Sequence, residues 1–292
     1  MAVPLSTGIA FAAKTHNDTY PAIAAADSKQ NGRAVFISGA SKGIGRATAI
    51  SFAQAGASDI AIAARSALDA VEEAVLDAAK TAGHRSPRVL KLALDVTDEE
   101  SVRSAASQTE QIFGRLDIVV NNAGCLEISA LLADIDQTTW LNTWEINLKG
   151  TYLMTRAFLP LLLKGGEKTI VNVSSIGAHL LLPGMSAYQS SKLATLRLTE
   201  FTSLEYAGQG ILAFAINPGS VATELGYNLP AEYHSILVDT PELPADTIVW
   251  LTQEKRAWLA GRYLSANWDM PEVMSREEEI VKDDKLKVRM VL

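Results

Sequence analysis

Short apolar runs alternate with amphipathic stretches along most of the chain, starting at residue 33. The runs are apolar on both faces and rich in Val, Ile and Ala, which is typical of strands in a parallel sheet covered on both sides. They predict strands at 33–39, 59–65, 88–96, 116–124, 168–175 and 211–219, and 261–266 is a candidate for a last one. The other stretches have helical spacing, at 44–56, 68–83, 98–114, 136–164, around 186–196 and at 241–251.

This alternation of strands and helices indicates the fold class. With right-handed crossovers it predicts a doubly wound Rossmann-type α/β fold, a parallel sheet of about seven strands with helices on both faces. No repeat or linker divides it. We expect one catalytic domain over 33–270, an N-terminal arm over 1–32 without strong periodicity, and a charged tail over 271–292 at the surface or at a subunit contact.

Composition narrows the possible partners. The net charge of the 292 residues is −7, which argues against nucleic acid or an anionic membrane as a partner. No apolar run has the ~18 residues of a membrane span. The single Cys125 excludes an intramolecular disulfide and is expected to be a packing residue, and the scattered histidines predict no metal site. A cytoplasmic enzyme is the expectation.

A glycine-rich segment, SGASKGIG (38–45), lies between the first strand and the first helix. Its glycines allow the backbone to approach a pyrophosphate, and the helix N-terminus offers free N–H groups. The alternative is a glycine-rich turn without a ligand. The expected cofactor contacts are Gly39, Ser41, Lys42, Gly43, Ile44 and Gly45.

The end of the second strand indicates which dinucleotide binds. Ala64 stands where folds that prefer NAD often carry an acid for the ribose 2′-hydroxyl. Arg65 and Ser66 follow, and an arginine fork pairs well with a 2′-phosphate. NADP(H) is therefore predicted over NAD(H); the alternative for Arg65 is an exposed arginine at a strand end.

Tyr188 and Lys192 stand four residues apart in SAYQSSKLATL (186–196). On a helix this spacing places a phenol and an ammonium on one face, one turn apart. Taken alone, a surface tyrosine beside a solvated lysine is the better explanation of the pair, so the rest of the chain has to decide.

Together these motifs resemble the short-chain dehydrogenase/reductase family, of the compact single-domain type, over residues 33–224. Ser38 replaces the usual threonine of the glycine loop and keeps its hydroxyl. The extensions at the two ends are similar to those of fungal members. The motifs stand in the family's order as SGASKGIG (38–45), Asp95, NNAG (121–124), Asn147, Ser175, the Tyr188 and Lys192 pair, and PGSVAT (218–223).

The resemblance implies catalytic roles for four residues. Tyr188 would protonate a carbonyl oxygen during reduction, or take the alcohol proton during oxidation. Lys192 and the oxidised nicotinamide would lower the phenol's pKa from about 10, and Lys192 would also bind the nicotinamide ribose. Ser175 would hold the substrate oxygen. Asn147 would organise a water that relays protons to Lys192, unless it is only a polar residue interrupting a helix.

Further cofactor contacts are implied by position. Asp95 would touch the adenine edge, with helix capping as the alternative. Ser174 is expected to be structural, and Asn121 supports either the cleft or the sheet. The other implied contacts are Val96, Asn122, Ala123, Gly124, Pro218, Gly219, Val221 and Thr223.

The substrate side is expected to be apolar, because 176–185 and 226–237 are mostly apolar. A lipophilic small-molecule carbonyl or alcohol is therefore predicted as substrate. Glu127 is a further polar candidate, and Tyr227 with Tyr233 would form a lid. The candidate substrate contacts are Ile176, His179, Met185 and Tyr227.

The helices at 136–164 and around 186–196 resemble those that pair across subunits in this family, which implies a homotetramer or a homodimer. Trp140 and Trp144 would lie in that interface or in the core. The predicted activity is NADP-dependent interconversion of a ketone and an alcohol. The alternatives are a redox-neutral dehydratase or epimerase on the same fold, and a cofactor-binding protein without turnover.

Overall fold

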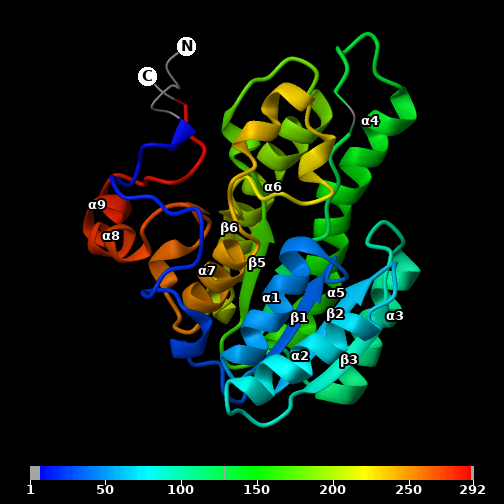
Figure 1. Ribbon diagram of the computed structural model, residues 1–292, viewed down its shortest axis with the longest axis vertical. Coiled ribbons are helices and arrows are strands. Elements are labelled where there is room, and N and C mark those ends of the chain that lie inside the picture. Colours follow the sequence, from blue (N-terminus) through cyan, green and yellow to red (C-terminus); the bar gives the residue numbers. More distant parts are fainter. Residues whose placement is uncertain (1–6, 128, 291–292) are drawn as a thin grey trace.

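The structure, a computed structural model, describes residues 7–127 and 129–290. Over these residues the chain forms a seven-stranded sheet of order β3-β2-β1-β4-β5-β6-β7, in which every neighbouring pair is parallel (Figure 1). The predicted doubly wound Rossmann-type fold is confirmed. The strands are β1 (Ala34–Ser38), β2 (Asp59–Ala64), β3 (Arg88–Ala93), β4 (Ile118–Asn121), β5 (Thr169–Val173), β6 (Leu212–Asn217) and β7 (Tyr263–Ser265).

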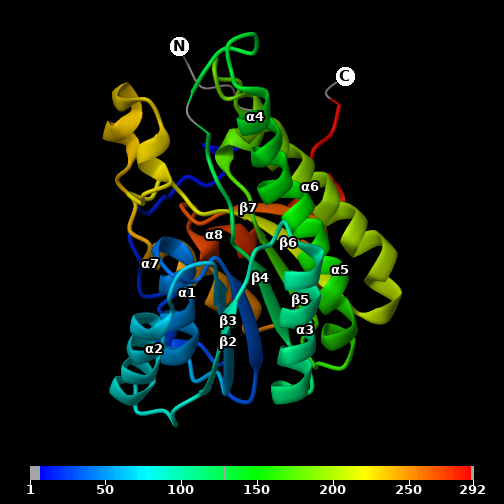
Figure 2. The ribbon, with the colours of Figure 1, turned by 90° about the vertical axis from the view of Figure 1, so that its right-hand side faces the viewer.

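Helices cover both faces of this sheet, as Figure 2 shows edge-on. Alternate side chains of β1 explain why each strand is apolar on both sides. Ile37 belongs to the core under one helix layer, whereas Phe36 packs under the other, with its ring centre 4.3 Å from that of Phe158. One layer contains α1 (Gly43–Gln54), α2 (Asp69–Thr81) and α7 (Glu242–Thr252), and the other α3 (Glu99–Phe113), α5 (Gly150–Leu163) and α6 (Ser186–Tyr206).

The predicted helix over 136–164 is interrupted in its middle. It consists of α4 (Gln137–Trp144), one π-helical segment η3 (Glu145–Lys149) and α5. A π-helical turn is wider than an α-helical one and often occurs at a functional site. Here it contains Asn147, which is buried.

The described part of the N-terminal arm packs on the C-terminal segment, and the two lie side by side in Figure 1. The Glu272 carboxylate accepts hydrogen bonds from the backbone N–H groups of Ala13 (2.8 Å) and Lys14 (3.0 Å). His16 Nε2 lies 2.9 Å from a carboxylate oxygen of Asp269. Ile23 is fully buried in the core under α1 and α7.

The charged C-terminal segment forms α8 (Met270–Ser275) and α9 (Glu277–Lys282). The expectation that this segment lies only on the surface or at a subunit contact is wrong for Ile280, which is fully buried. Met270 and Val273 are buried as well, whereas the charged side chains of both helices stay at least partly exposed. The division into arm, domain and tail stays a prediction.

We expect Ile23→Ala to lower the free energy of unfolding by about 2–4 kcal/mol, because a buried isoleucine leaves a cavity. Urea unfolding followed by circular dichroism measures this. Ile9→Ala is the control, since Ile9 is 45% exposed and its loss should change stability by less than about 0.5 kcal/mol. Equal, small effects would show that the arm is not part of the core.

Candidate active site

A cavity of about 530 Å³ lies at the carboxyl ends of the central strands. The strand order reverses between β1 and β4, and ligands of doubly wound folds bind at such a point. Of the sequence-predicted residues, the cavity brings together Gly39, Ser41, Lys42, Gly43, Ile44, Arg65, Ser66, Asp95, Val96, Asn122, Ala123, Gly124, Tyr188, Lys192, Pro218 and Thr223. Gly45, Gly219 and Val221 are not among the lining residues, although each is adjacent in sequence to one that is.

Close packing in the glycine loop explains why two of its positions are glycine. Gly39 has a φ of +66°, in the left-handed region. A Cβ at Gly45 would lie 2.4 Å from the carbonyl oxygen of Gly39 and 2.5 Å from Asn122 Nδ2. Helix α1 can therefore start directly beneath the loop. No side chain caps this helix end, so its first N–H groups and its positive dipole end are available to an anion.

Hydrogen bonds join the glycine loop to the end of β4. Asn122 Nδ2 donates to the carbonyl oxygens of Ser38 (2.9 Å) and Gly39 (3.1 Å). Ser38 Oγ accepts from the backbone N–H groups of Asn122 and Ala123, both at 3.1 Å. The hydroxyl that Ser38 shares with threonine is therefore the group that matters at this position.

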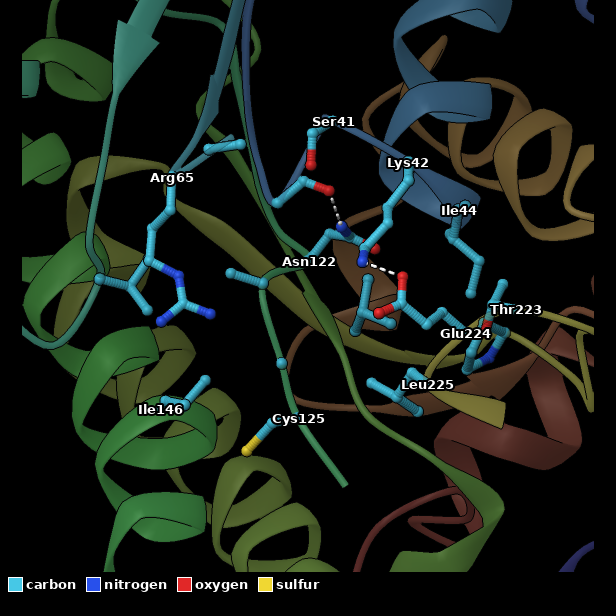
Figure 3. Close-up of a pocket in the computed structure, with 18 of the residues that line it drawn as sticks. Ser41, Lys42, Ile44, Arg65, Asn122, Cys125, Ile146, Thr223, Glu224 and Leu225 are labelled. Atoms are coloured by element: carbon cyan, nitrogen blue, oxygen red, sulfur yellow. Dashed lines mark hydrogen bonds and ion pairs between the residues drawn. The ribbon is translucent and has the colours of Figure 1, made fainter. Parts of the chain in front are cut away.

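Two cations stand at the cavity, as predicted, and one of them is already paired. The exposed Arg65 extends from the end of β2 into the cavity (Figure 3). Lys42 forms an exposed ion pair with Glu224, which comes from the loop after β6. This pair connects the glycine loop to the opposite wall.

The Asp95 carboxylate lines the cavity and does not cap a helix. Its Oδ1 accepts from the backbone N–H (2.9 Å) and the hydroxyl (2.7 Å) of Thr97. These bonds hold the pKa of Asp95 below its usual range. The alternative role of capping α3 is wrong, because the Asp98 side chain accepts from the N–H groups of Glu100 and Ser101.

Tyr188 and Lys192 meet at one end of the cavity. Desolvation raises the pKa of Tyr188 to about 12, and the hydrogen bond with Ser175 only partly offsets this. The lowering that we expected from Lys192 is not found in the chain alone. Lys192 Nζ donates to the carbonyl oxygen of Val173 (2.9 Å) and lies 5.7 Å from the centre of the phenol ring. Burial lowers the pKa of this lysine to about 8.

Asn147 anchors helix α6 to the segment that follows β4. Its Oδ1 accepts from the backbone N–H of Cys125 (2.9 Å). Its Nδ2 donates to the carbonyl oxygen of Cys125 (3.0 Å) and to Ser191 Oγ (3.1 Å), so both amide protons have partners. The proton relay through Asn147 stays a prediction. The structure places Asn147 inside the π-helical turn.

The two serines after β5 have different partners. Ser174 Oγ donates to the carbonyl oxygen of Lys192 (3.1 Å), which agrees with the expected structural role. Ser175 Oγ accepts from the N–H of Gly177 (3.0 Å) and is bonded to the Tyr188 phenol. Asn121 is also structural, since its Nδ2 donates to Asn172 Oδ1 (2.8 Å) between neighbouring strands.

The four residues expected to touch substrate are not among the lining residues of the described cavity. His179 lies edge-on to Tyr263, with ring centres 4.7 Å apart, and burial lowers its pKa. Met185 is buried at the start of α6. Ile176 donates its N–H to Asn217 Oδ1 (2.9 Å). Tyr227 is 57% exposed.

Several lining residues were not predicted as such: Cys125, Ile146, Glu224, Leu225 and Pro241. The first four could have been predicted, because each stands one or two residues from a motif in the sequence. Pro241 could not, because only the path of a long loop brings it back to the cavity. Cys125 is half-buried, and burial raises the pKa of its thiol.

The described residues contain no metal-holding cluster and no membrane-spanning helix. In the ranges 7–127 and 129–290, no group of three His, Cys, Asp or Glu side chains is arranged to hold a metal ion. Within the same ranges, no helix combines the length and the apolar character needed to cross a membrane.

A glycine loop, an uncapped helix end and a Tyr–Lys pair in one cavity define a dinucleotide-dependent oxidoreductase site. A family profile described as short chain dehydrogenase matches residues 33–234. The chain is 68% identical over 292 residues to the short chain dehydrogenase mpl6 of Monascus purpureus, with 100% of both chains covered.

Solved structures agree with this match. A short chain dehydrogenase from Salmonella enterica serovar Typhi has a TM-score of 0.74 at 27% identity, covering 85% of this chain and 99% of that one. Carveol dehydrogenase from Mycobacterium avium, in complex with NAD, has a TM-score of 0.72 at 24% identity, covering 82% and 97%. The chain therefore belongs to the short-chain dehydrogenase/reductase family, whose members bind a nicotinamide cofactor, and its expected similarity to fungal members is confirmed.

Proposed function

We propose that the protein is an NADP(H)-dependent oxidoreductase that interconverts a ketone and a secondary alcohol on a lipophilic small molecule, with Tyr188 as general acid and base. One observation carries this proposal: a single cavity joins the glycine loop to the Tyr188 and Lys192 pair. Its lining includes both Arg65, next to the end of β2, and Tyr188 on α6, and a volume of about 530 Å³ suits a dinucleotide.

The cofactor, when bound, supplies or accepts the hydride. The chain's own residues handle the proton and the orientation. With a pKa of about 12, the Tyr188 phenol is protonated at neutral pH and can donate to a carbonyl oxygen. Ser175, bonded to that phenol, is placed to hold the same oxygen. Oxidation of an alcohol requires the phenolate and is therefore favoured at higher pH.

Lys192 is suited to restoring the proton. Its pKa of about 8 lies close to neutral pH, so the ammonium exchanges protons readily in that range. The carbonyl of Val173 fixes its position at 2.9 Å. The predicted relay through Asn147 remains part of this proposal.

The preference for NADP(H) is supported by the environment of the β2 end. Ala64 supplies no carboxylate for a ribose 2′-hydroxyl, and Arg65 extends into the cavity beside it. A guanidinium can bind a phosphate through two hydrogen bonds. Ser66 adds a hydroxyl, and Lys42 a second cation once its pair with Glu224 opens.

The substrate class is supported by the apolar side chains in the cavity lining. These include Ile146, Val173 and Leu225, together with Cys125. Such a surface favours a lipophilic carbonyl compound or alcohol over a charged one. The complete set of Asn147, Ser175, Tyr188 and Lys192 favours net redox turnover over a redox-neutral reaction or an idle scaffold.

We also propose a homo-oligomer, a tetramer or a dimer, formed through α4, α5 and α6. These helices present an apolar groove to solvent, lined mainly by Leu141, Trp144, Leu148, Tyr152, Ala194, Leu198 and Phe201. Phe201 is 51% exposed and Tyr152 47%. An apolar surface of this kind is typical of a contact with a second copy. A cytoplasmic location stays a prediction.

Tyr188→Phe should lower ketone reduction by about 10²–10⁴-fold, because the proton donor is lost. NADPH binding, followed by fluorescence titration, should change little. The control is Tyr206→Phe at the far end of α6, which should keep parental turnover. A fully active Tyr188→Phe variant would rule out this acid and base.

Arg65→Ala should weaken NADPH by at least about tenfold and leave NADH nearly unchanged, because only the 2′-phosphate loses a charged partner. Fluorescence titration with each cofactor measures both constants. Arg85→Ala removes an exposed arginine elsewhere and should affect neither. Equal losses for NADPH and NADH would contradict the proposed phosphate contact.

Phe201→Glu should convert the oligomer into smaller species, because a buried carboxylate without a partner is unfavourable. Sedimentation velocity at micromolar concentration measures the change. Ile112→Glu on α3, a residue that is 50% exposed, should leave the parental state intact. A monomeric parent protein would overturn the proposal.

A further inference from the structure

Helix α6 carries Tyr188 but lacks a cap of its own. The first N–H groups of a helix have no partner within it, and a side-chain oxygen at the N-cap position usually accepts one of them. Here the N-cap position is held by Met185, which makes no side-chain hydrogen bond. Tyr188 is the third residue of the helix, so its own N–H is one of these unpaired donors.

Glu127 supplies the missing acceptor from a distant segment. Its Oε1 accepts the Tyr188 N–H at 2.9 Å, across 61 residues of sequence. Glu127 is only 5% exposed and does not line the described cavity. The earlier expectation that it touches substrate is therefore not supported.

Helix α4 holds this arrangement from the other side. Thr143 Oγ1 lies 3.5 Å from Glu127 Oε2. Trp140 Nε1 donates to the hydroxyl of Ser186, the first residue of α6, at 3.2 Å. The start of the catalytic helix is therefore fixed by groups from two other segments rather than by its own sequence.

We propose that Glu127 is a positioning residue for the reaction: its buried carboxylate caps α6 and fixes Tyr188 against the cavity. This inference rests on the proposed function for the role of Tyr188. The carboxylate lies at the positive end of the helix dipole, where a negative charge is stabilised. The same charge disfavours a second negative charge on the nearby phenol.

Glu127 is the carboxylate that acts on Tyr188, and the other groups around the phenol are of different kinds. The segment after β4 also contributes the Cys125 thiol, and α6 contributes Lys192. From α4 come Thr143 and Trp140, and from the end of β5 comes the Ser175 hydroxyl, none of which titrates near neutral pH. The 3-10 helix η4 (Ile176–His179) carries His179, whose ring packs on Tyr263 instead.

Glu127→Gln and Glu127→Ala separate the cap from the charge. The glutamine keeps an oxygen for the Tyr188 N–H but removes the charge, so kcat for ketone reduction at neutral pH should stay within about threefold while its alkaline limb moves to lower pH. The alanine also loses the cap, and we expect kcat to fall about tenfold or more with little change in KM. Asp136→Asn is the matched control, since Asp136 caps α4 through the Thr139 N–H at 2.8 Å. It should leave both the pH profile and kcat/KM unchanged.

A second measurement does not depend on turnover. In protein labelled with ¹³C at tyrosine Cζ, the Tyr188 signal is identified by its loss in Tyr188→Phe, and its titration should shift to lower pH in Glu127→Gln. An unshifted titration would overturn the inference, as would identical behaviour of the glutamine and alanine variants. A shifted titration in a protein that reduces no ketone would support Glu127 and refute the proposed function instead.

Discussion

The anchoring of helix α6 to the end of β4 is the constraint on which the site depends. A single amide side chain, Asn147, provides it by binding both backbone groups of Cys125 and the hydroxyl of Ser191. Ser191 in turn donates to the carbonyl oxygen of Tyr188 at 2.8 Å. The π-helical turn brings Asn147 to this point, and a regular helix over 136–164 would place the amide differently. Irregular backbone here is therefore part of the active-site architecture.

Burial acts on the Tyr188 and Lys192 pair in opposite directions. It raises the pKa of the phenol to about 12 and lowers that of the ammonium to about 8, because both charged forms lose hydration. The protein thus favours a neutral phenol beside a lysine that gives up its proton easily. In the proposed reaction, the oxidised nicotinamide would supply the positive charge that an oxyanion on Tyr188 requires.

The sequence was sufficient for the features that depend on local chemistry. The apolar runs predicted the strands, because neighbouring residues such as Phe36 and Ile37 point to opposite faces of the sheet and both must be buried. The glycines at 39 and 45 predicted the phosphate loop, since a Cβ at either position would come too close to the backbone and to Asn122. The spacing of Tyr188 and Lys192 predicted that both side chains lie on one face of a helix.

Features that depend on long-range packing could not be predicted in this way. Glu127 reads as a loop carboxylate until α6 is placed above it, and Pro241 reaches the cavity only through the path of a long loop. The charged pattern around Ile280 suggests a solvated tail, although this one side chain is buried. The pKa of Tyr188 also depends on enclosure, which spacing alone does not reveal.

The pairing of the arm with the C-terminal segment has a consequence for how the molecule assembles. The contacts of Ala13, His16 and Tyr20 are with residues 248 to 259 positions further along the chain. Contacts of such sequence separation carry a large loop-closure entropy until the intervening chain is already compact. We therefore expect the arm to dock after the sheet has formed. The Phe11 ring of the arm lies with its centre 5.0 Å from that of the buried Trp268, so the environment of this tryptophan should report on the docking.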